Sequence, residues 1–171
     1  MAVRQVVKHG HQVLTGNLPQ IEEVTPELRA IIDDMVDTMR EGDPPGVGLA
    51  GPQIGEALRV VVAEPPPDHE DDVAVYRDAV VLINPQIVMA SGREVIEEGC
   101  LSCPGVTADV ERPSHVVVTG LDIDGKSVKL EVTGALARIF QHEIDHLNGK
   151  FFFDHLNPLK RQLVKARIRR T

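Results

Sequence analysis

Apolar residues recur at helical spacing in three stretches of the chain, at 25–42, 133–149 and 159–170. The first stretch begins with Thr25 and Pro26, which are suited to the N-cap and to the first turn of a helix. Its expected buried stripe consists of Leu28, Ile31, Ile32, Met35, Val36 and Met39. The second stretch ends at an Asn-Gly pair, which is typical of a helix C-terminus. The pattern therefore predicts an N-terminal, a central and a C-terminal helix.

Runs rich in β-branched residues between the first two helices predict strands at 58–64 and 79–90 and near the REVIEEG segment. Two further runs flank Asp124 and Gly125, which is a strong hairpin signal. The segment 42–55 has too much glycine and proline for a regular element, so we expect a shaped loop there. The acidic, proline-rich segment 65–72 predicts a surface loop. This order of elements predicts an α+β fold with antiparallel sheets.

The length of 171 residues is sufficient for one domain, residues 1–171, around a single core. The net charge of −8 is unevenly distributed, because six of the 18 basic residues and no acidic residue lie within 160–170. We expect the acidic body to repel polyanions, whereas the basic C-terminal helix, 159–171, could contact one. The alternative is a solvated helix end, at which cations favour the negative pole of the helix dipole.

The beginning of the sequence has neither the apolar run of a signal peptide nor an amphipathic presequence, and no later stretch reaches the length of a membrane span. A cytoplasmic protein is therefore expected. Cys100 and Cys103 lie three positions apart. In a reducing compartment, this spacing indicates metal or redox chemistry rather than a structural disulfide.

The central helix carries the sequence QHEIDH, in which Glu143 falls among apolar residues at helical spacing. A buried carboxylate costs several kcal/mol unless something compensates for it, so a helix that only packs would not carry one there. His142 and His146 flank it, one turn apart. In an H-E-x-x-H helix, two imidazoles bind one metal ion and the glutamate reaches the water on that ion. The alternative is a pair of surface histidines beside a salt-bridged glutamate.

A catalytic site of this kind needs a third protein ligand. Phe152 stands six residues after His146, which excludes the extended metallopeptidase pattern with a third histidine there. Asp154 and His155 remain candidates. The segment 97–105, EEGCLSCPG, is a better source, because one of its cysteines would complete an open catalytic set. Both cysteines together would instead make a closed, structural Cys₂His₂ site.

Three motifs, GVGLAGPQ at 46–53, EEGCLS at 97–102 and QHEIDH at 141–146, resemble the signature motifs of the peptide deformylase family. They stand in the family's order and at its approximate separations, and the resemblance extends over essentially the whole chain. It departs from the family's usual pattern at Gly51, Cys103 and Thr107. The resemblance implies a metal-dependent hydrolase that removes the formyl group from N-formylmethionine at the start of new polypeptides and releases formate.

The resemblance also assigns residues. It implies that Cys100, His142 and His146 bind the metal and that Glu143 is the acid and base. Gln53 and the backbone N–H of Leu101 would hold the formyl oxygen. The expected substrate-binding residues are Val47, Gly48, Ile96, Gly99 and Ile139, of which Val47, Ile96 and Ile139 would form the apolar wall for methionine. The fold expected is one of antiparallel sheets packed around a central metal-binding H-E-x-x-H helix.

The expected cofactor is one divalent ion per chain. The resemblance indicates Fe²⁺, although Cys/His₂ ligands also suit Zn²⁺, Ni²⁺ and Co²⁺. The expected partners are N-formylmethionyl nascent peptides and the ribosome, the latter through the basic C-terminal helix, and the protein is expected to be a monomer with no membrane partner. Two other functions stay open at this point, namely a metallopeptidase that cuts internal amide bonds and a non-catalytic protein with a structural Cys₂His₂ zinc.

Overall fold

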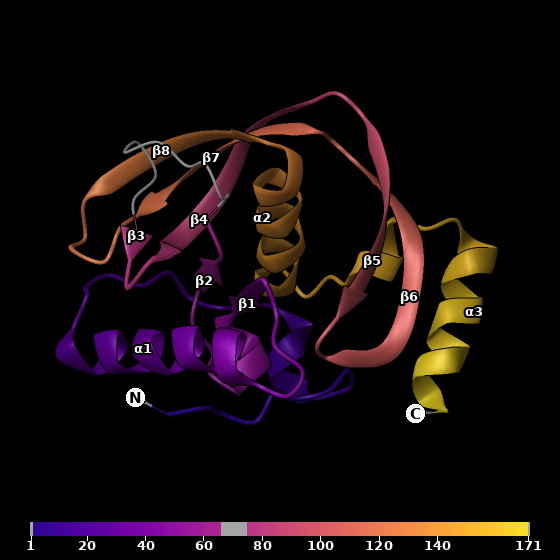
Figure 1. Cartoon of the computed structure of the whole chain (residues 1–171), viewed down its shortest axis with the longest axis horizontal. Helices are drawn as coiled ribbons and strands as arrows, with labels where there is room; N and C mark the ends of the chain where they lie inside the picture. Colours follow the sequence, from indigo (N-terminus) through magenta and orange to yellow (C-terminus); the bar gives the residue numbers. More distant parts are fainter. Residues whose placement is uncertain (1, 66–74, 171) are drawn as a thin grey trace.

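The computed structural model describes residues 2–65 and 75–170, and Figure 1 shows their arrangement. The acidic loop expected at 65–72 lies outside these residues except for its first position. Within the described ranges there are three α-helices and eight strands. No helix in this part of the chain has both the length and the apolar character that crossing a membrane requires.

Helix α1 spans Pro26–Glu41, as the capping residues predict. The Thr25 hydroxyl accepts a hydrogen bond of 3.1 Å from the Leu28 N–H, which satisfies a donor that the first turn leaves free. Gly42 follows at the C-terminal end. Five members of the predicted stripe are buried, and Ile31 is partly buried against the same core. The predicted amphipathic helix is confirmed.

The main sheet is antiparallel throughout, in the spatial order β1-β2-β4-β7-β8. Its strands are β1 (Gly48–Ala50), β2 (Val60–Ala63), β4 (Ala79–Ser91), β7 (His115–Leu121) and β8 (Ser127–Thr133), and β3 (Val75–Tyr76) pairs with the start of β4. The predicted hairpin joins β7 to β8, and Gly125 in its turn has a φ of 76°.

Successive side chains of β2 and β4 point to opposite faces of the sheet, and both faces are buried. Val61 and Leu82 belong to the core that includes α2, whereas Val60 and Ile83 belong to the core that includes α1. Side chains on a strand point alternately to opposite faces, so one helix covers each face of the sheet. In Figure 1, α1 lies along one side of β1 and β2, and α2 stands on the other.

A second, two-stranded sheet consists of β5 (Glu94–Cys100) and β6 (Cys103–Arg112). Its core includes Val110 of β6, Phe152 and Phe153 of a short 3₁₀ helix, η3 (Phe152–His155), and Val164 of α3. Helix α3 spans Pro158–Arg169, close to the predicted C-terminal helix. It packs against β6 on the side away from α2 (Figure 1).

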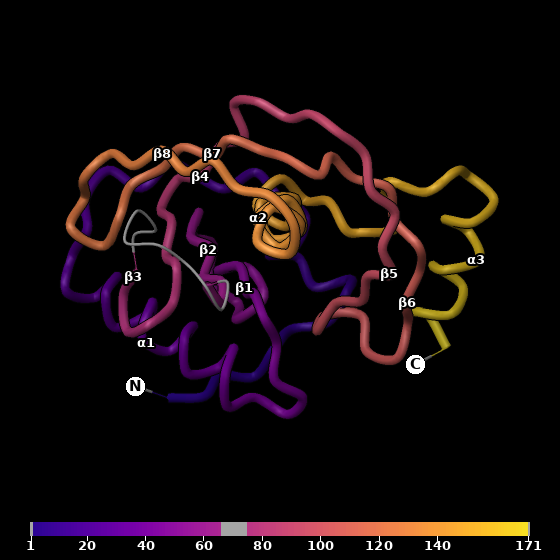
Figure 2. The backbone as a smooth tube through the Cα atoms, turned by 45° about the horizontal axis from the view of Figure 1, so that its top comes forward, coloured from indigo at the N-terminus to yellow at the C-terminus, as the bar shows by residue number. Residues whose placement is uncertain are grey.

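Helix α2 spans Gly134–Leu147 and lies between the two sheets, where Figure 2 shows it end-on. One side carries Leu136, Phe140, Ile144 and Leu147 into the core of the main sheet. The opposite side, which carries the two histidines of the motif, faces the β5–β6 hairpin. The predicted α+β fold, with antiparallel sheets around a central helix, is confirmed.

The prediction of a loop without regular structure at 42–55 was wrong in part. Strand β1 and a 3₁₀ helix, η2 (Gly51–Ile54), lie within it. Strand β1 forms because Leu49 and its neighbours find a partner in β2, which is distant in sequence. Strand β6 and a 3₁₀ helix at Gln12–Thr15, η1, were also not predicted.

Candidate metal centre

Three side chains from two elements converge beside α2. Cys100 ends β5, and His142 and His146 lie one turn apart on α2. Their ligand atoms all lie within 4.8 Å of one another, and Cys100 Sγ is 3.3 Å from His146 Nε2. Zinc-type ions bind sulfur and nitrogen at about 2.0–2.3 Å, so a single ion can bridge this span. The donor set and its spacing fit a bound divalent metal.

The two other candidates for a third ligand are occupied elsewhere. One carboxylate oxygen of Asp154 accepts a hydrogen bond of 2.9 Å from the Phe151 N–H. His155 Nε2 lies 2.6 Å from a carboxylate oxygen of Asp145. Neither residue belongs to the group that can hold a metal among the described residues. The third ligand therefore comes from the preferred segment, 97–105, and not from either of these two alternatives.

Cys103 lies opposite Cys100 across the turn between β5 and β6, and it also stays outside the metal-binding group. Only 1% of its surface is exposed. Its thiol hydrogen-bonds to the Cys100 sulfur, and this bond together with burial raises the pKa of Cys103. The same bond is the main reason why the pKa of Cys100 lies well below its usual value. Burial would raise this pKa, and the two histidines lower it further. The group therefore has three ligands rather than four.

A buried ion-pair network holds His142, and the sequence analysis did not identify it. Glu98 accepts a hydrogen bond of 2.8 Å from His142 Nδ1 and bonds of 2.6 Å from Arg112 Nε and from Arg138 Nη1. A carboxylate can only accept, so the proton of the imidazole is assigned to Nδ1. This tautomer leaves Nε2 of His142 to bind the metal.

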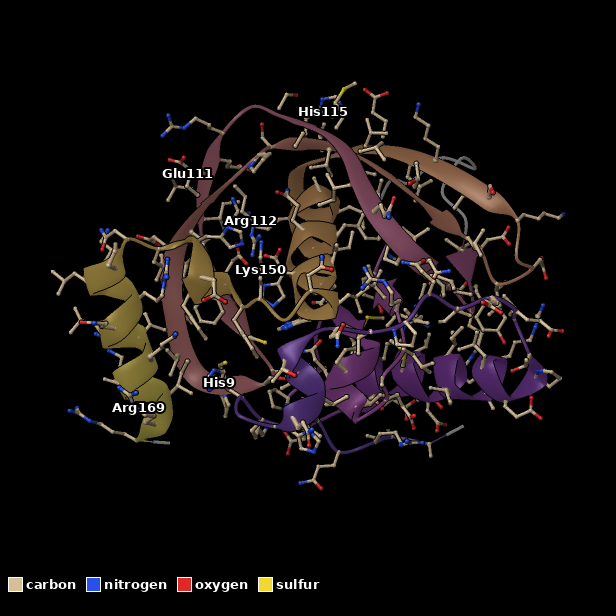
Figure 3. All side chains as sticks on the ribbon, turned by 180° about the vertical axis from the view of Figure 1, so that it is seen from behind. His9, Glu111, Arg112, His115, Lys150 and Arg169 are labelled. Atoms are coloured by element: carbon tan, nitrogen blue, oxygen red, sulfur yellow. The ribbon has the colours of Figure 1, made fainter. Side chains whose placement is uncertain are left out.

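Glu98 is ionised in this network. Burial by itself would raise its pKa, but the hydrogen bonds from His142 and Arg112 outweigh burial and lower the pKa to about 2. Figure 3 shows Arg112 in the space between α2 and the β5–β6 hairpin. One sequence signal could have found Glu98, since it stands two residues before Cys100 on a strand and so shares its face.

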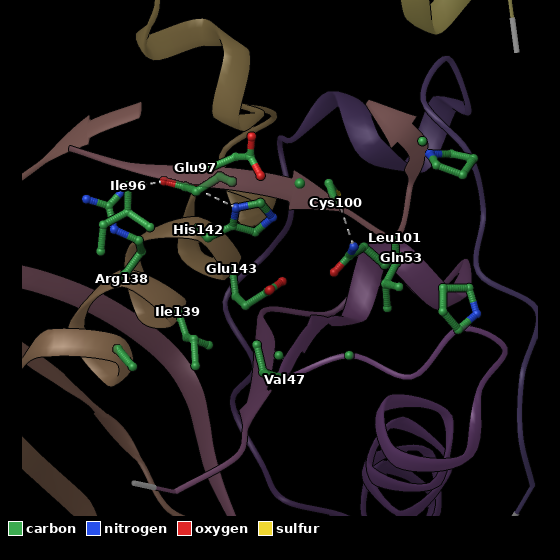
Figure 4. Close-up of a pocket in the computed structure, with 18 of the residues that line it drawn as sticks. Val47, Gln53, Ile96, Glu97, Cys100, Leu101, Arg138, Ile139, His142 and Glu143 are labelled. Atoms are coloured by element: carbon green, nitrogen blue, oxygen red, sulfur yellow. Dashed lines mark hydrogen bonds and ion pairs between the residues drawn. The ribbon is translucent and has the colours of Figure 1, made fainter. Parts of the chain in front are cut away.

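A cavity of about 570 Å³ opens beside the metal-binding group (Figure 4). The predicted site residues that line it are Val47, Gly48, Gln53, Ile96, Gly99, Cys100, Leu101, Ile139, His142 and Glu143. The remaining predicted residue, His146, does not line the cavity and is only 1% exposed. Lys8, Pro44 and Arg138 line it as well and were not predicted.

Glu143 is buried and points into this cavity rather than into the aliphatic core (Figure 4). Burial raises the pKa of its carboxyl group. Its Oε2 atom has no hydrogen-bond partner among the described residues. Gly48 allows this position, because a Cβ atom there would lie 2.9 Å from Glu143 Oε1 and 2.6 Å from Ile139 Cγ2. The result is a buried carboxylate with one oxygen free to act on a ligand.

Gln53 presents its amide nitrogen to the same space. Its Oε1 atom accepts a hydrogen bond of 2.9 Å from the Ala50 N–H, which fixes the orientation of the amide. Nε2 then donates toward Cys100 Sγ at 3.6 Å and Ser102 Oγ at 3.4 Å. The amide group is thus held as a donor next to the metal ligand.

The N-terminal segment 7–9 connects the two parts of the chain that carry these groups. The Val7 N–H donates to the Gln53 carbonyl at 2.8 Å, and the His9 N–H donates to the Ser102 carbonyl at 2.9 Å. Helix η2 and the turn after β5 are therefore tied to one backbone segment. No local pattern in the sequence indicates these contacts, because they join residues about 50 to 90 positions apart.

Comparisons with known proteins agree on one family. The polypeptide deformylase family model matches residues 3–162. A peptide deformylase of Thermodesulfovibrio yellowstonii is 40% identical over 169 residues, which cover 99% of this chain and 98% of the relative. The solved peptide deformylase of Legionella pneumophila is 38% identical with a TM-score of 0.85, over 99% of this chain and 95% of that one. The solved peptide deformylase of Ehrlichia chaffeensis in complex with actinonin is 34% identical with a TM-score of 0.86, and the match covers 99% of this chain and 98% of that one. The chain therefore belongs to the polypeptide deformylase family, the enzymes that remove the N-formyl group from newly made polypeptides.

Proposed function

We propose that this chain hydrolyses the formyl group of N-formylmethionyl peptides at one divalent metal ion held by Cys100, His142 and His146. The main support for this proposal is the buried carboxylate of Glu143. One of its oxygens is free in the cavity, beside three residues that can bind a metal ion. A closed structural site has no use for such a group. When bound, the ion lowers the pKa of its water to near 7 and so supplies a nucleophile at neutral pH.

Glu143 moves the proton in this proposal. It accepts a proton from the nucleophilic water and delivers it to the amine that leaves when the C–N bond of the formamide breaks. Its raised pKa brings the carboxyl group closer to the working pH, which suits both halves of the transfer. The close approach of Gly48 to the carboxylate limits its movement between the two steps.

Gln53 and Leu101 stabilise the charge that develops on the formyl oxygen. The Gln53 amide is fixed as a donor by Ala50, and it cannot titrate in the working range. The second donor is the backbone N–H of Leu101, directly after the metal ligand; the carbonyl of the same residue accepts a bond of 3.1 Å from Lys8 Nζ. A preorganised donor of this kind contributes about 3 kcal/mol of transition-state stabilisation.

The peptide binds as an added strand along β1. Among the described residues, this strand pairs with β2 on one edge only, and N–H and C=O groups alternate between edges along an antiparallel strand. The Val47 carbonyl accepts from the Glu64 N–H on the β2 side, so the polar groups of Gly48 face the free edge and the cavity. Main-chain pairing there would give affinity without strong preference for later side chains.

The methionine side chain lies on apolar surface contributed by Val47, Ile96 and Ile139, all of which line the cavity. Gly99 on β5 also lines the cavity, and its lack of a side chain leaves room for the peptide. For the metal, the proposal is Fe²⁺, the ion that the family resemblance implies. The donor set of one thiolate and two imidazoles also suits Zn²⁺, Ni²⁺ and Co²⁺.

Formate release from formyl-Met-Ala-Ser tests this function against its rivals. The deformylase predicts formate and intact Met-Ala-Ser, and it predicts no reaction with acetyl-Met-Ala-Ser of the same length. Release of formylmethionine and Ala-Ser would favour a metallopeptidase. No product from enzyme that contains one metal ion per chain would favour a structural zinc site.

We also propose that the basic α3 contacts the ribosome near the exit of the nascent chain. Its exposed cations are Lys160, Arg167, Arg169 and Arg170. Truncation after Pro158 would not test this contact cleanly, because Val164 is buried in the core against β6. Replacing the four exposed cations with glutamine should weaken co-sedimentation with ribosomes at low salt and leave hydrolysis of short peptides intact. The matched control replaces four exposed cations elsewhere, Arg93, Lys126, Lys129 and Lys150. Equal co-sedimentation of both variants would contradict the contact.

The expected cytoplasmic location and monomeric state stay predictions.

A further inference from the structure

Cys103 takes no part in the proposed reaction, although it completes a C-x-x-C sequence with the metal ligand Cys100. The two residues are the first and last of a four-residue turn, and they lie opposite each other at the end of the β5–β6 ladder. The outer Cα atoms of such a turn are less than about 7 Å apart, and disulfides span about 4.4–6.8 Å between Cα atoms. A cross-link therefore needs little backbone movement.

The two sulfurs differ in access. Cys100 lines the cavity, whereas Cys103 is 1% exposed and packs in the core with Val106, Val110 and Phe153. A small oxidant that enters the cavity reaches Cys100 first. The chain has no third cysteine, so Cys103 is the thiol beside any oxidised form of Cys100.

We propose that Cys100 and Cys103 form a peroxide-sensitive thiol pair, in which Cys103 converts oxidised Cys100 into a reversible disulfide. The Cys100 thiolate attacks one oxygen of hydrogen peroxide, the O–O bond breaks, and a sulfenic acid and hydroxide form. The Cys103 sulfur then attacks the sulfenic sulfur; the S–S bond forms, the S–O bond breaks, and the oxygen leaves as water. The proton of the Cys103 thiol leaves in this water, and the hydroxide from the first step takes up the proton that Cys100 lost when it became a thiolate. In sum, two thiols lose two electrons and two protons, and one peroxide becomes two waters.

The disulfide removes the thiolate ligand and leaves two imidazoles for the metal, so oxidation releases the ion and stops turnover. A dithiol that enters the cavity attacks the Cys100 sulfur and restores both thiols. Without Cys103, the sulfenic acid would meet more peroxide and pass to sulfinic and sulfonic acids, which thiols do not reduce. The inference rests on the proposed function only for the effect on turnover, because the cross-link itself is measured by mass.

The test treats the metal-loaded enzyme, with and without prior chelation, with hydrogen peroxide and measures the tryptic peptide that begins at Glu94 and contains both cysteines. The thiol pair predicts a loss of about 2 Da that dithiothreitol reverses. In Cys103→Ala, the same peptide should gain about 32 or 48 Da. After dithiothreitol and fresh metal, the wild type should recover at least about tenfold more of its lost activity than this variant.

A wild-type peptide that gains oxygen while Cys103 stays a free thiol would overturn the proposal, and so would recovery that is equal in the two proteins. The wild-type mass decides the matter even if Cys103→Ala does not fold. Appearance of the cross-link in an enzyme that never releases formate would contradict the proposed function and leave the thiol pair intact.

Discussion

Glu98 accepts a hydrogen bond of 2.8 Å from Nδ1 of His142, and this contact sets which ring nitrogen faces the metal. Replacing Glu98 with glutamine keeps the shape but removes the charge that Arg112 and Arg138 balance. Metal affinity should fall about 10- to 100-fold, because the second partner of a ligating histidine is lost. Titration with a competing chelator measures this change.

The same substitution should also lower the free energy of unfolding by about 3–5 kcal/mol, because buried Arg138 loses its counter-charge and buried Arg112 keeps only Asp145. Glu97→Gln is the matched control, since Glu97 is the exposed neighbour on β5. A thermal melt of the two variants separates the outcomes. Equal melting temperatures for Glu98→Gln and Glu97→Gln would show that the network is not a supporting structure.

Gly48→Ala tests the close approach of β1 to the carboxylate of Glu143. The new Cβ would lie 2.6 Å from Ile139 Cγ2 and 2.9 Å from Glu143 Oε1, so the two side chains must move. A displacement of about 1 Å at a reacting group can cost about 100-fold, and we expect a loss of that order in kcat/KM for a formylated peptide. Gly120→Ala on β7, outside this cavity, serves as the comparison, because its Cβ would lie 3.0 Å from the Ile83 carbonyl oxygen. Similar kinetics for the two variants would count against a positioned Glu143.

Glu143→Gln removes the proton carrier and keeps the volume of the side chain. Because an amide cannot relay a proton, kcat should fall by about 10²- to 10⁴-fold while the metal stays bound. Steady-state formate release and metal analysis of the same preparation measure both quantities. If the variant retained its metal and most of its activity, Glu143 would have a structural role and the proposed mechanism would be wrong.

The sequence predicted best what local patterns determine. Helix α1 follows from its cap at Thr25 and its apolar spacing, and the β7–β8 hairpin follows from Asp124 and Gly125. Strand β1 could not be predicted in the same way, because it is three residues long within a glycine-rich segment and depends on pairing with β2. Its existence is a tertiary property.

The residues of the candidate site also differ in whether a local pattern could predict them. Residues within the three motifs could be predicted, and the structure places Cys100 and Glu143 at one cavity, with His146 behind Cys100 in the metal-binding group. Glu98 lay inside a motif without a predicted role, because its partners Arg112 and Arg138 come from β6 and α2. Spacing along the chain does not show which distant cations neutralise a buried acid.

An open metal centre with three protein ligands predicts that two cysteine variants will differ in metal content. Cys100→Ala should lose tightly bound metal, because two imidazoles alone are a poor site for a divalent ion. Cys103→Ala should keep one ion per chain and most of its formate release, since Cys103 lies in the core outside the metal-binding group. In a closed Cys₂His₂ site, each substitution would remove one of four ligands, release the metal and unfold the protein. Mass spectrometry of metal content with a thermal melt therefore decides between the two: loss in Cys100→Ala alone is the predicted result, and matching losses in both variants would contradict it.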